Sequence, residues 1–314
     1  MRAAAALGLA VGVLLAGCGG GPNPDTAGAP APGSLESLWR APGEDVAVVP
    51  GAADFAPGRV RFSFLIVDRR GRVVSRPGAR VWLARGLRQK PFYETTARRE
   101  RIGAEGAHRE AHGSEPTEIF VTHLDVSRPG TYWLLAEPAG GRKIQAVGTL
   151  VVNQRTRAPA VGEQAPPSRT PTIASTGGKL GLLTTQEPPD RELLRHSIAA
   201  SLAARVPFVV SFATPRYCTS RACGPVVDVL GALSRRYSAR RYSDRRLRFI
   251  HVEIYKDNDP AQGFNRWVQE WRLPSEPFTF LVGADGRIKE RFEGSASVRE
   301  LTVAIDRHLV ASRG

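Results

Sequence analysis

The chain of 314 residues has little methionine, cysteine and lysine, and these shortages limit what it can do. Met1 is its only methionine, so a thioether site for a soft metal ion is excluded. Cysteine occurs three times, which makes each of its positions informative. Beyond the N-terminal segment, no run is apolar enough to predict a membrane-spanning helix, and the remainder is expected to be soluble.

The charge of the chain is strongly one-sided, with 44 basic and 30 acidic residues and a formal net charge of +14. Nearly all of the basic residues are arginines, and they are scattered through both halves of the sequence without a basic recognition motif. This distribution argues against nucleic-acid binding and favours an ordinary solvated basic surface. Such a surface also suits contact with anionic lipid headgroups or a cell-wall polymer.

The N-terminal residues have the composition of a secretory signal. Arg2 supplies a positive charge, residues 3–16 form a short apolar run, and the run ends in Leu-Ala-Gly before Cys18. This ending resembles a bacterial lipobox, which implies cleavage before Cys18 and attachment of a diacylglyceryl group to its sulfur. We therefore expect residues 1–17 to be removed, and the protein to be lipid-anchored on the extracytoplasmic face of the cell membrane.

Composition divides the rest of the chain into four segments. Residues 18–45 are rich in Gly, Pro, Ala and Ser and predict a flexible tether, and residues 154–175 form a second, proline-rich linker. Residues 46–153 consist of short alternating apolar runs that end in Gly/Pro turns, which favours an all-β sandwich of immunoglobulin-like type. No cysteine pair bridges its sheets, and the charged stretch 94–115 is expected to be a long loop. Residues 176–314 alternate strands with helices.

Strand and helix patterns alternate throughout this last segment. A continuous apolar run at 207–213 predicts a central strand covered on both faces, and 247–255 predicts the next strand. Residues 284–286 are typical of a β-hairpin turn, and Ser297 with Glu300 forms a capping box for a last helix. The predicted order is α-β-α-β-α-β-β-α, with helical apolar stripes at Leu194, Ile198 and Leu202, at Val226, Val229, Leu230, Leu233 and Tyr237, at Phe264, Trp267, Val268 and Trp271, and at Leu301, Ile305 and Leu309.

That order of elements, with a cysteine pair just after the first central strand, resembles that of the thioredoxin-like superfamily. Together with the lipobox-like ending, this order makes the chain resemble a member that is tethered to the membrane as a lipoprotein. The residues that carry the resemblance are FATPRYCTSRACGP (212–225) and LPSEPFTFLVGADGRI (273–288), preceded by VGEQAP (161–166). The resemblance implies an α/β domain whose central mixed sheet has helices on both faces, and a cis peptide bond before Pro277. It also implies that Tyr217, Glu276 and Pro277 bind an extended substrate strand, to which the proline backbone would present unpaired groups.

Cys218 and Cys223 are the candidate catalytic residues. A thiolate is the nucleophile in disulfide exchange, and its pKa falls at a helix N-terminus and beside cations such as Arg216 and Arg221. We therefore predict a thiol–disulfide oxidoreductase that needs no cofactor and acts on cysteine-containing extracytoplasmic proteins, together with a membrane thiol donor or acceptor. A purely structural disulfide explains the pair less well, because closing a ring of six residues adds little to stability through loop-closure entropy.

The site departs from the family pattern in three ways. Four residues separate the cysteines where the family has two, so on a regular helix their side chains would lie about 140° apart. Val226 stands where the second cysteine of the usual motif would complete it, and no carboxylate occupies the place of the family's buried acid, near Ser211. The identity of the nucleophile stays open between Cys218, which an aromatic residue precedes as in the family, and Cys223.

Two other functions share parts of this pattern. Cys-Thr-Ser-Arg-Ala-Cys-Gly also resembles atypical two-cysteine peroxiredoxins, but Glu276-Pro277 replaces the arginine that polarises peroxide in that family. Copper-delivery proteins of thioredoxin type use Cys-x-x-x-Cys and a later histidine; the spacing here differs, and His251 lies mid-strand among apolar residues. His108 and His112 are four residues apart in the expected loop, and His123 follows it; this is a weak signal, so no metal site is predicted there.

Overall fold

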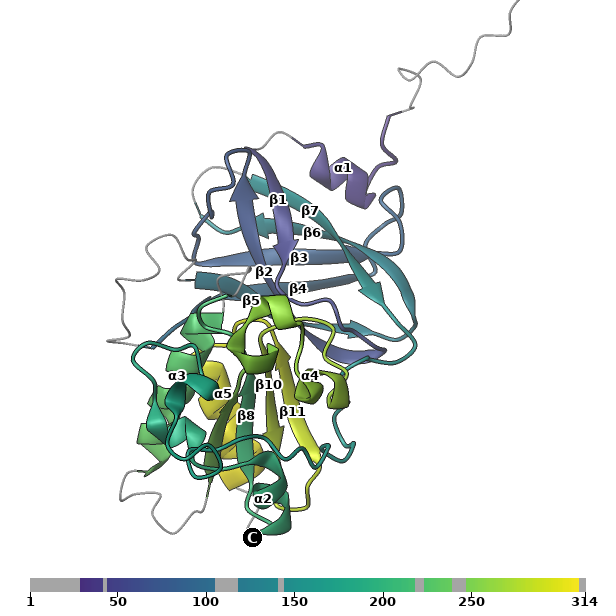
Figure 1. Cartoon of the computed structure of the whole chain (residues 1–314). Helices are drawn as coiled ribbons and strands as arrows, with labels where there is room; N and C mark the ends of the chain where they lie inside the picture. The colour runs from purple at the N-terminus through teal and green to yellow at the C-terminus, as the bar shows by residue number, and fades with distance from the viewer. Residues whose placement is uncertain are drawn as a thin grey trace, which may run out of the picture.

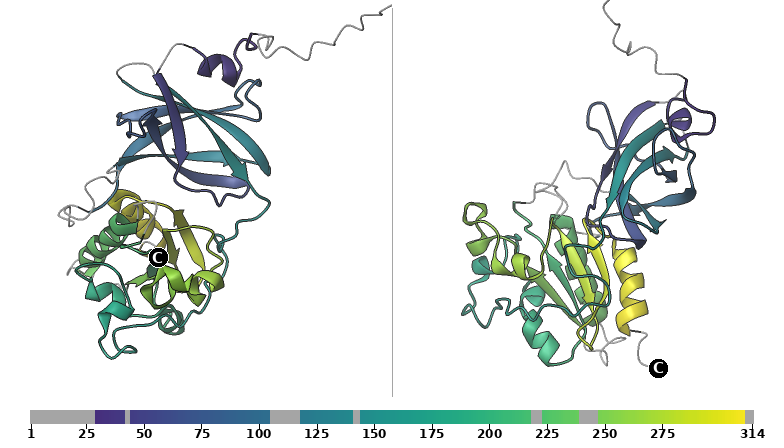
Figure 2. Two further views of the ribbon diagram at one scale, coloured as in Figure 1. Left: turned by 45° about the horizontal axis from the view of Figure 1, so that its top comes forward. Right: turned by 90° about the vertical axis from the view of Figure 1, so that its right-hand side faces the viewer.

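Two β-rich units are stacked on each other in the computed structural model of the chain (Figure 1). The first is a closed barrel and the second is a four-stranded sheet with helices, and Figure 2 shows the same stacking from two further directions. The structure describes residues 29–41, 44–104, 118–140, 144–217, 223–238 and 247–310.

Seven strands form the barrel. They are β1 (Glu44–Pro50), β2 (Gly58–Asp68), β3 (Gly78–Ala84), β4 (Tyr93–Arg101), β5 (Glu118–Val126), β6 (Gly130–Pro138) and β7 (Ile144–Val152). Their order around the barrel is β1-β2-β5-β4-β3-β6-β7, and neighbours are antiparallel except β1 and β7. The parallel pairing of β1 with β7 closes the barrel and leaves no open sheet edge.

Apolar side chains at alternate strand positions fill the interior of the barrel. Phe62 stacks on Phe64 with ring centroids 5.3 Å apart, and Phe64 stacks on Phe120 at 5.4 Å. The short helix α1 (Leu35–Trp39) lies at the end of the barrel away from the second unit (Figure 1), where Leu35 is fully buried in a cluster with Trp82. This part of the expected tether is therefore packed against the barrel.

The prediction of an immunoglobulin-like sandwich was wrong, because the strands form one closed barrel. Two strands that the sequence pattern did not reveal account for the closure. Strand β1 supplies the parallel partner of β7, and β4 joins β3 to β5 within the stretch expected to be a loop. Only Ala97 and Glu100 of β4 are buried, so backbone hydrogen bonds rather than an apolar face hold this strand in place.

The second unit is a mixed four-stranded sheet with the strand order β11-β10-β8-β9. Strands β8 and β9 are parallel, and the other neighbours are antiparallel. The strands are β8 (Phe208–Phe212), β9 (Arg248–Val252), β10 (Phe278–Val282) and β11 (Ile288–Glu293).

The helices are α2 (Ile198–Ala203), α3 (Cys223–Ser238), α4 (Arg266–Glu270) and α5 (Val298–Ile305), which continues into η8 (Asp306–Val310). Short 3₁₀ turns are η3 (Leu180–Leu182), η4 (Arg191–Leu194), η6 (Lys256–Asn258) and η7 (Pro260–Gln262).

The two longest helices of this unit, α3 and α5, pack together against one face of the sheet, where Leu230 and Leu301 are buried. Short α2, short α4 and loop residues cover the opposite face. There the fully buried Trp271 contacts Phe212 and Phe280, with ring centroids 5.0 and 4.7 Å away. The sheet therefore has a separate apolar core on each face.

Three local predictions from the sequence are confirmed. The Ser297 hydroxyl accepts a hydrogen bond from the N–H of Glu300 at 3.0 Å, and the Glu300 carboxylate accepts one from the N–H of Ser297 at 3.2 Å, as a capping box requires. The turn between β10 and β11 includes Gly286, whose φ is 75°. The peptide bond between Glu276 and Pro277 is cis.

The predicted fold class, and the thioredoxin-like resemblance behind it, were wrong. The chain is mainly β, with a seven-stranded barrel, a small four-stranded sheet and few helices, rather than the expected α/β domain. Among the described helices, only α3 and α5 reach eight residues, and both lie on the same face of the sheet. The first expected helix breaks because Asp190 and Ser197 each cap a separate piece, the four-residue η4 and the six-residue α2. The third shrinks to the five-residue α4, and Phe264 of its predicted stripe lies outside it, 56% exposed.

Three ion pairs among the described residues connect the barrel to the second unit, and in two of them the arginine side chain is mostly buried. Arg61 of β2 forms a bidentate pair with Glu300 of α5 at 2.8 and 3.0 Å, and both side chains are at most 10% exposed. Arg291 of β11 pairs at 2.7 Å with Asp54, which lies between β1 and β2. Both guanidinium groups also donate to backbone carbonyls, so the buried charges are well compensated.

Residues 154–175 connect the two units and follow the outer edge of β11. The N–H of Gly162 donates to the carbonyl of Ile288 at 2.8 Å, and the N–H of Ile288 donates to the carbonyl of Glu163 at 2.9 Å. This connection is therefore bonded to the sheet along part of its length. Among the helices that the structure describes, none has the length and apolar character needed to cross a membrane.

Candidate functional site

The predicted catalytic residues belong to the connection between β8 and α3. Strand β8 ends at Phe212, and α3 begins at Cys223. Cys218 and the expected lipidation site Cys18 lie outside the described residues. The chain is described as far as Tyr217, the residue before Cys218, and the site can therefore be built from the residues around this segment.

His251 of β9 joins two chain segments near the end of β8. It is 5% exposed, its Nδ1 lies 3.3 Å from Oγ1 of Thr184, and its Nε2 lies 3.1 Å from the carbonyl oxygen of Ala213. Because a carbonyl only accepts, we assign the ring proton to Nε2 and the donor role toward Nδ1 to the Thr184 hydroxyl. Burial lowers the pKa of His251 below its ordinary value of 6.5, against the opposing effect of the nearby Glu253.

Glu253, the residue after β9, is a buried acid that connects to the segment leading to Cys218. It is 5% exposed, and its Oε1 accepts hydrogen bonds from the N–H and the hydroxyl of Thr185 at 2.6 and 2.5 Å. The same hydroxyl oxygen accepts a hydrogen bond at 3.1 Å from the N–H of Arg216, two residues before Cys218. The Thr185 hydroxyl thus links Glu253 to this segment.

The second carboxylate oxygen of Glu253, Oε2, is buried without a hydrogen-bond partner among the described residues. The Oγ1 of Thr214, in the segment after β8, is buried and unpartnered in the same way. Leaving buried polar atoms unpaired costs free energy, about 1–3 kcal/mol each, so each such atom calls for an explanation, and a catalytic role is one that can supply it. Ser211, where the family acid was expected, instead forms a 2.7 Å hydrogen bond with Thr279.

Three aromatic rings lie beside the same segment. Tyr217 is 36% exposed, and its ring meets that of Tyr255 edge-on with centroids 6.5 Å apart. Tyr255 stacks on Phe264 with centroids 5.5 Å apart and an interplanar angle of 7°. The cluster presents exposed apolar surface at Phe264 and at Tyr217, the residue before Cys218, and such a surface suits the side chains of a protein substrate.

Glu276 and Pro277 lie at the same end of β8 as this segment. Phe278 pairs with Phe212, so Pro277 is level with the residue that follows β8. Pro277 is buried, and its carbonyl accepts a hydrogen bond from the N–H of Gly294 at 2.8 Å. That carbonyl is therefore paired within the protein, contrary to the expectation that this backbone presents unpaired groups to a substrate.

The barrel also approaches the cysteine connection. Gly103, two residues after β4, lies beside Pro225 in the first turn of α3, so that a Cβ at Gly103 would be 3.9 Å from the Cβ of Pro225. This contact places the end of a barrel strand at the helix that begins with Cys223. The barrel therefore contributes to the surroundings of the predicted site, which the sequence did not indicate.

The histidines considered as metal ligands are dispersed. His108 and His112 lie outside the described residues, His123 is on β5, and both ring nitrogens of His251 are engaged. Within the described ranges, no three His, Cys, Asp or Glu side chains come together in a way that could hold a metal ion. Comparisons of the chain with known protein families, with curated proteins and with solved structures found no match.

Sequence reasoning named Tyr217 as a substrate-binding residue and considered His251 only as a metal ligand. It did not single out Thr184, Thr185 or Glu253. The available signal was a pair of ionisable residues, His251 and Glu253, on the same side of an otherwise apolar strand run. Residues at alternate positions of a buried strand share its buried surroundings, so such a pair indicates an enclosed polar site.

Proposed function

We propose that the chain is a lipid-anchored, extracytoplasmic thiol–disulfide oxidoreductase that acts through Cys218 and Cys223. The observation that carries the proposal is buried Glu253, with an unpartnered carboxylate oxygen and a hydrogen-bonded connection through Thr185 to the segment before Cys218. A carboxylate held out of water beside a thiol segment is suited to accept the thiol proton and to return it.

The proposed reaction is disulfide exchange in two steps. In the reducing direction, the thiolate of one cysteine attacks a sulfur of the substrate disulfide, forms a mixed disulfide and releases one substrate thiolate. The second cysteine, after losing its proton, attacks the mixed disulfide, releases the other substrate thiolate and leaves a Cys218–Cys223 disulfide. Two electrons pass to the substrate, and the two protons of the cysteine pair end on the released thiols.

The remaining parts of the proposal follow from position and surface. The lipobox-like sequence before Cys18 would place the site in a compartment where disulfides persist. The exposed rings of Tyr217 and Phe264 offer a contact surface for a cysteine-containing protein. A membrane thiol donor or acceptor would return the pair to its starting state, so no cofactor is needed.

The test is capture of a mixed disulfide by single-cysteine variants. Cys223→Ser and Cys218→Ser are made in the mature chain carrying Cys18→Ser, and each is mixed with a disulfide-containing peptide. One of the two is expected to accumulate a stable covalent adduct that a reductant releases, which also identifies the nucleophile. The variant lacking both cysteines is the control. If neither single-cysteine variant forms an adduct beyond this control, the oxidoreductase proposal is rejected.

A further inference from the structure

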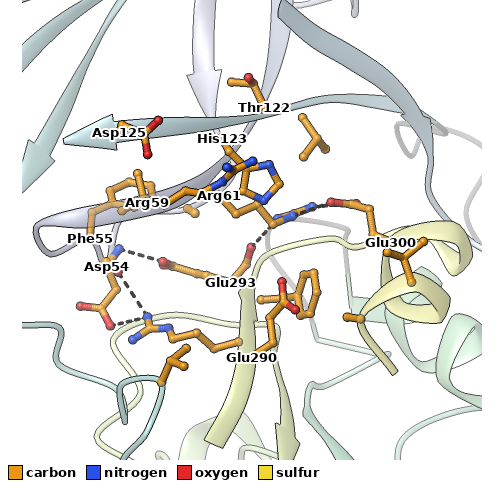
Figure 3. Close-up of a pocket in the computed structure, with 18 of the residues that line it drawn as sticks. Asp54, Phe55, Arg59, Arg61, Thr122, His123, Asp125, Glu290, Glu293 and Glu300 are labelled. Carbon is orange, nitrogen blue, oxygen red and sulfur yellow. Dashed lines mark hydrogen bonds and ion pairs between the residues drawn. The ribbon is translucent and has the colours of Figure 1, made fainter. Parts of the chain in front are cut away.

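A cavity of about 980 Å³ lies between the barrel and the second unit, apart from the cysteine site (Figure 3). Its barrel wall is the outer face of β2, β5 and β4, and its other wall is formed by β11, α5 and η8. The volume is at the upper end of the range of small-molecule sites, roughly 300–1,000 Å³. The ion pair between Arg61 and Glu300 spans the two walls (Figure 3).

Almost all of the acidic side chains that line the cavity already have an ion-pair or hydrogen-bond partner within the protein. Three form ion pairs with arginine: Asp54 with Arg291, Glu100 with Arg299, and Glu300 with Arg61. The carboxylate of Glu290 lies 3.2 Å from Nε2 of His308, which carries a charge only when protonated. Glu293 accepts hydrogen bonds from the N–H groups of Ala53 and Asp54 at 2.9 and 2.7 Å. Asp125, which accepts a hydrogen bond from the Tyr93 hydroxyl at 3.3 Å, is the one lining acid whose charge has no ion-pair or N–H partner among the described residues.

Three exposed arginines that line the cavity form no ion pair with any described residue, and they come from both walls. Arg59 of β2 and Arg98 of β4 lie on either side of β5, the strand that carries His123, and Arg307 of η8 belongs to the opposite wall. Burial, followed by the positive charges of Arg59 and Arg61, lowers the pKa of His123. The barrel wall is therefore electropositive where His123 lies.

Two lining acids oppose part of this positive charge. Asp125 is level with Arg59 in the β2–β5 register, and Glu290, whose pKa burial raises, lies near enough to His308 and Arg307 for their charges to lower that pKa in part. The described lining still carries seven basic and six acidic side chains, an excess that favours an anion.

We propose that this cavity binds a small soluble ligand with at least two oxyanionic groups, carboxylate or phosphate, one held by Arg59 on the barrel wall and the other by Arg307 on the opposite wall. A guanidinium group donates two parallel hydrogen bonds to such an oxyanion, which gives both strength and orientation. The neutral ring of His123 adds a further donor on the barrel wall. Because the ligand contacts both units, its binding also stabilises the folded chain.

Titration calorimetry with two probes tests the proposal. Pyrophosphate and citrate are titrated separately into the mature chain carrying Cys18→Ser at constant ionic strength, with trehalose as an uncharged control. Saturable binding to one site is expected for at least one of the two anions, with a rise in Tm at saturation, and none for trehalose. Arg59→Gln and Arg307→Gln are each expected to weaken the affinity about tenfold or more, because each removes charge-assisted hydrogen bonds.

Arg236→Gln is the matched control, because it makes the same charge change at an exposed position of α3 that does not line the cavity. The affinity of this variant for the anion is expected to stay within about twofold of that of the parent chain. Equal weakening by all three variants would show a general effect of net charge and overturn the proposal. The absence of saturable binding for both anions would overturn it as well. The inference is independent of the cysteine chemistry, and the calorimetry can be repeated without Cys218 and Cys223.

Discussion

His251 shows how burial of one side chain makes the stability of the chain depend on pH. Its pKa is lower in the folded state than the ordinary 6.5, chiefly because of burial, so the unfolded chain binds more protons in acid. The stabilisation from neutral His251 is complete above about pH 6.5 and is lost as the pH falls toward the lowered pKa. His251→Gln is therefore expected to flatten the fall in the free energy of unfolding between about pH 7 and 5, measured by urea titration.

The matched control for this prediction is His196→Gln. Burial also lowers the pKa of His196, but this ring is only partly buried, so its replacement is expected to remove a smaller part of the slope. A slope that His251→Gln leaves unchanged would mean that the buried ring does not set the acid sensitivity.

Glu253 gives the second prediction at this scale, and it concerns reactivity. If its carboxylate exchanges a proton with the attacking thiol, Glu253→Gln slows disulfide exchange on the order of 10²-fold near neutral pH, the usual size of a general acid–base contribution. The measurement is the rate of reduction of a disulfide peptide as a function of pH, compared between the parent chain and the variant. Glu270→Gln, at an exposed acid on α4, controls for the change of charge. Unchanged profiles in both variants would remove Glu253 from the reaction.

At the scale of elements, short sequence patterns predicted the features that depend only on residues close together in the chain. The capping box, the turn at residues 284–286 and the apolar strand runs all depend on nearby residues, and each is present as expected. The patterns failed where an element depends on distant partners. The polar β4 is a strand because β3 and β5 pair with it, and α2 is short because Asp190 and Ser197 both start helical turns.

Helix α5 supplies the prediction at this scale. Ser297 caps α5 and also donates a hydrogen bond to the buried Glu100 of β4 at 2.9 Å, so it acts on both units. Ser297→Ala is expected to lower the free energy of unfolding by about 1–3 kcal/mol, the cost of a lost cap plus an unsatisfied buried group. Ser197→Ala, which removes a cap from α2 without such a second bond, is expected to cost about 1 kcal/mol. Equal losses in the two variants, measured by chemical denaturation, would contradict the bridging role of Ser297.

For the whole molecule, the arrangement of the two units is the feature that the sequence revealed least. The contacts that hold them, such as those of Arg61 with Glu300, join residues more than 200 positions apart that show no local pattern. Separation along the chain also hid the cavity between the units and the contact of Gly103 with Pro225 of α3. The cysteine pair could be proposed from sequence because its chemistry needs only two residues close together along the chain.

The buried ion pair between Arg61 and Glu300 gives the prediction for the whole molecule. Removing one partner leaves a buried charge uncompensated, so Arg61→Gln is expected to lower the free energy of unfolding by roughly 3–5 kcal/mol. The control is Arg195→Gln, which breaks a pair with Glu192 in which both side chains are more than half exposed. This variant is expected to change the free energy of unfolding by less than about 1 kcal/mol. Similar small effects in both variants would show that the pair does not hold the units together.

The central claim is that Cys218 and Cys223 form a reversible redox pair, and a redox titration tests it most directly. The mature chain carrying Cys18→Ser is equilibrated with reduced and oxidised glutathione at a series of ratios, its free thiols are alkylated, and the products are weighed by mass spectrometry. We predict a single two-electron transition that is the same when approached from the reduced and from the oxidised side. A pair that stays fully reduced or fully oxidised across the series, or that oxidises without returning, would contradict the account.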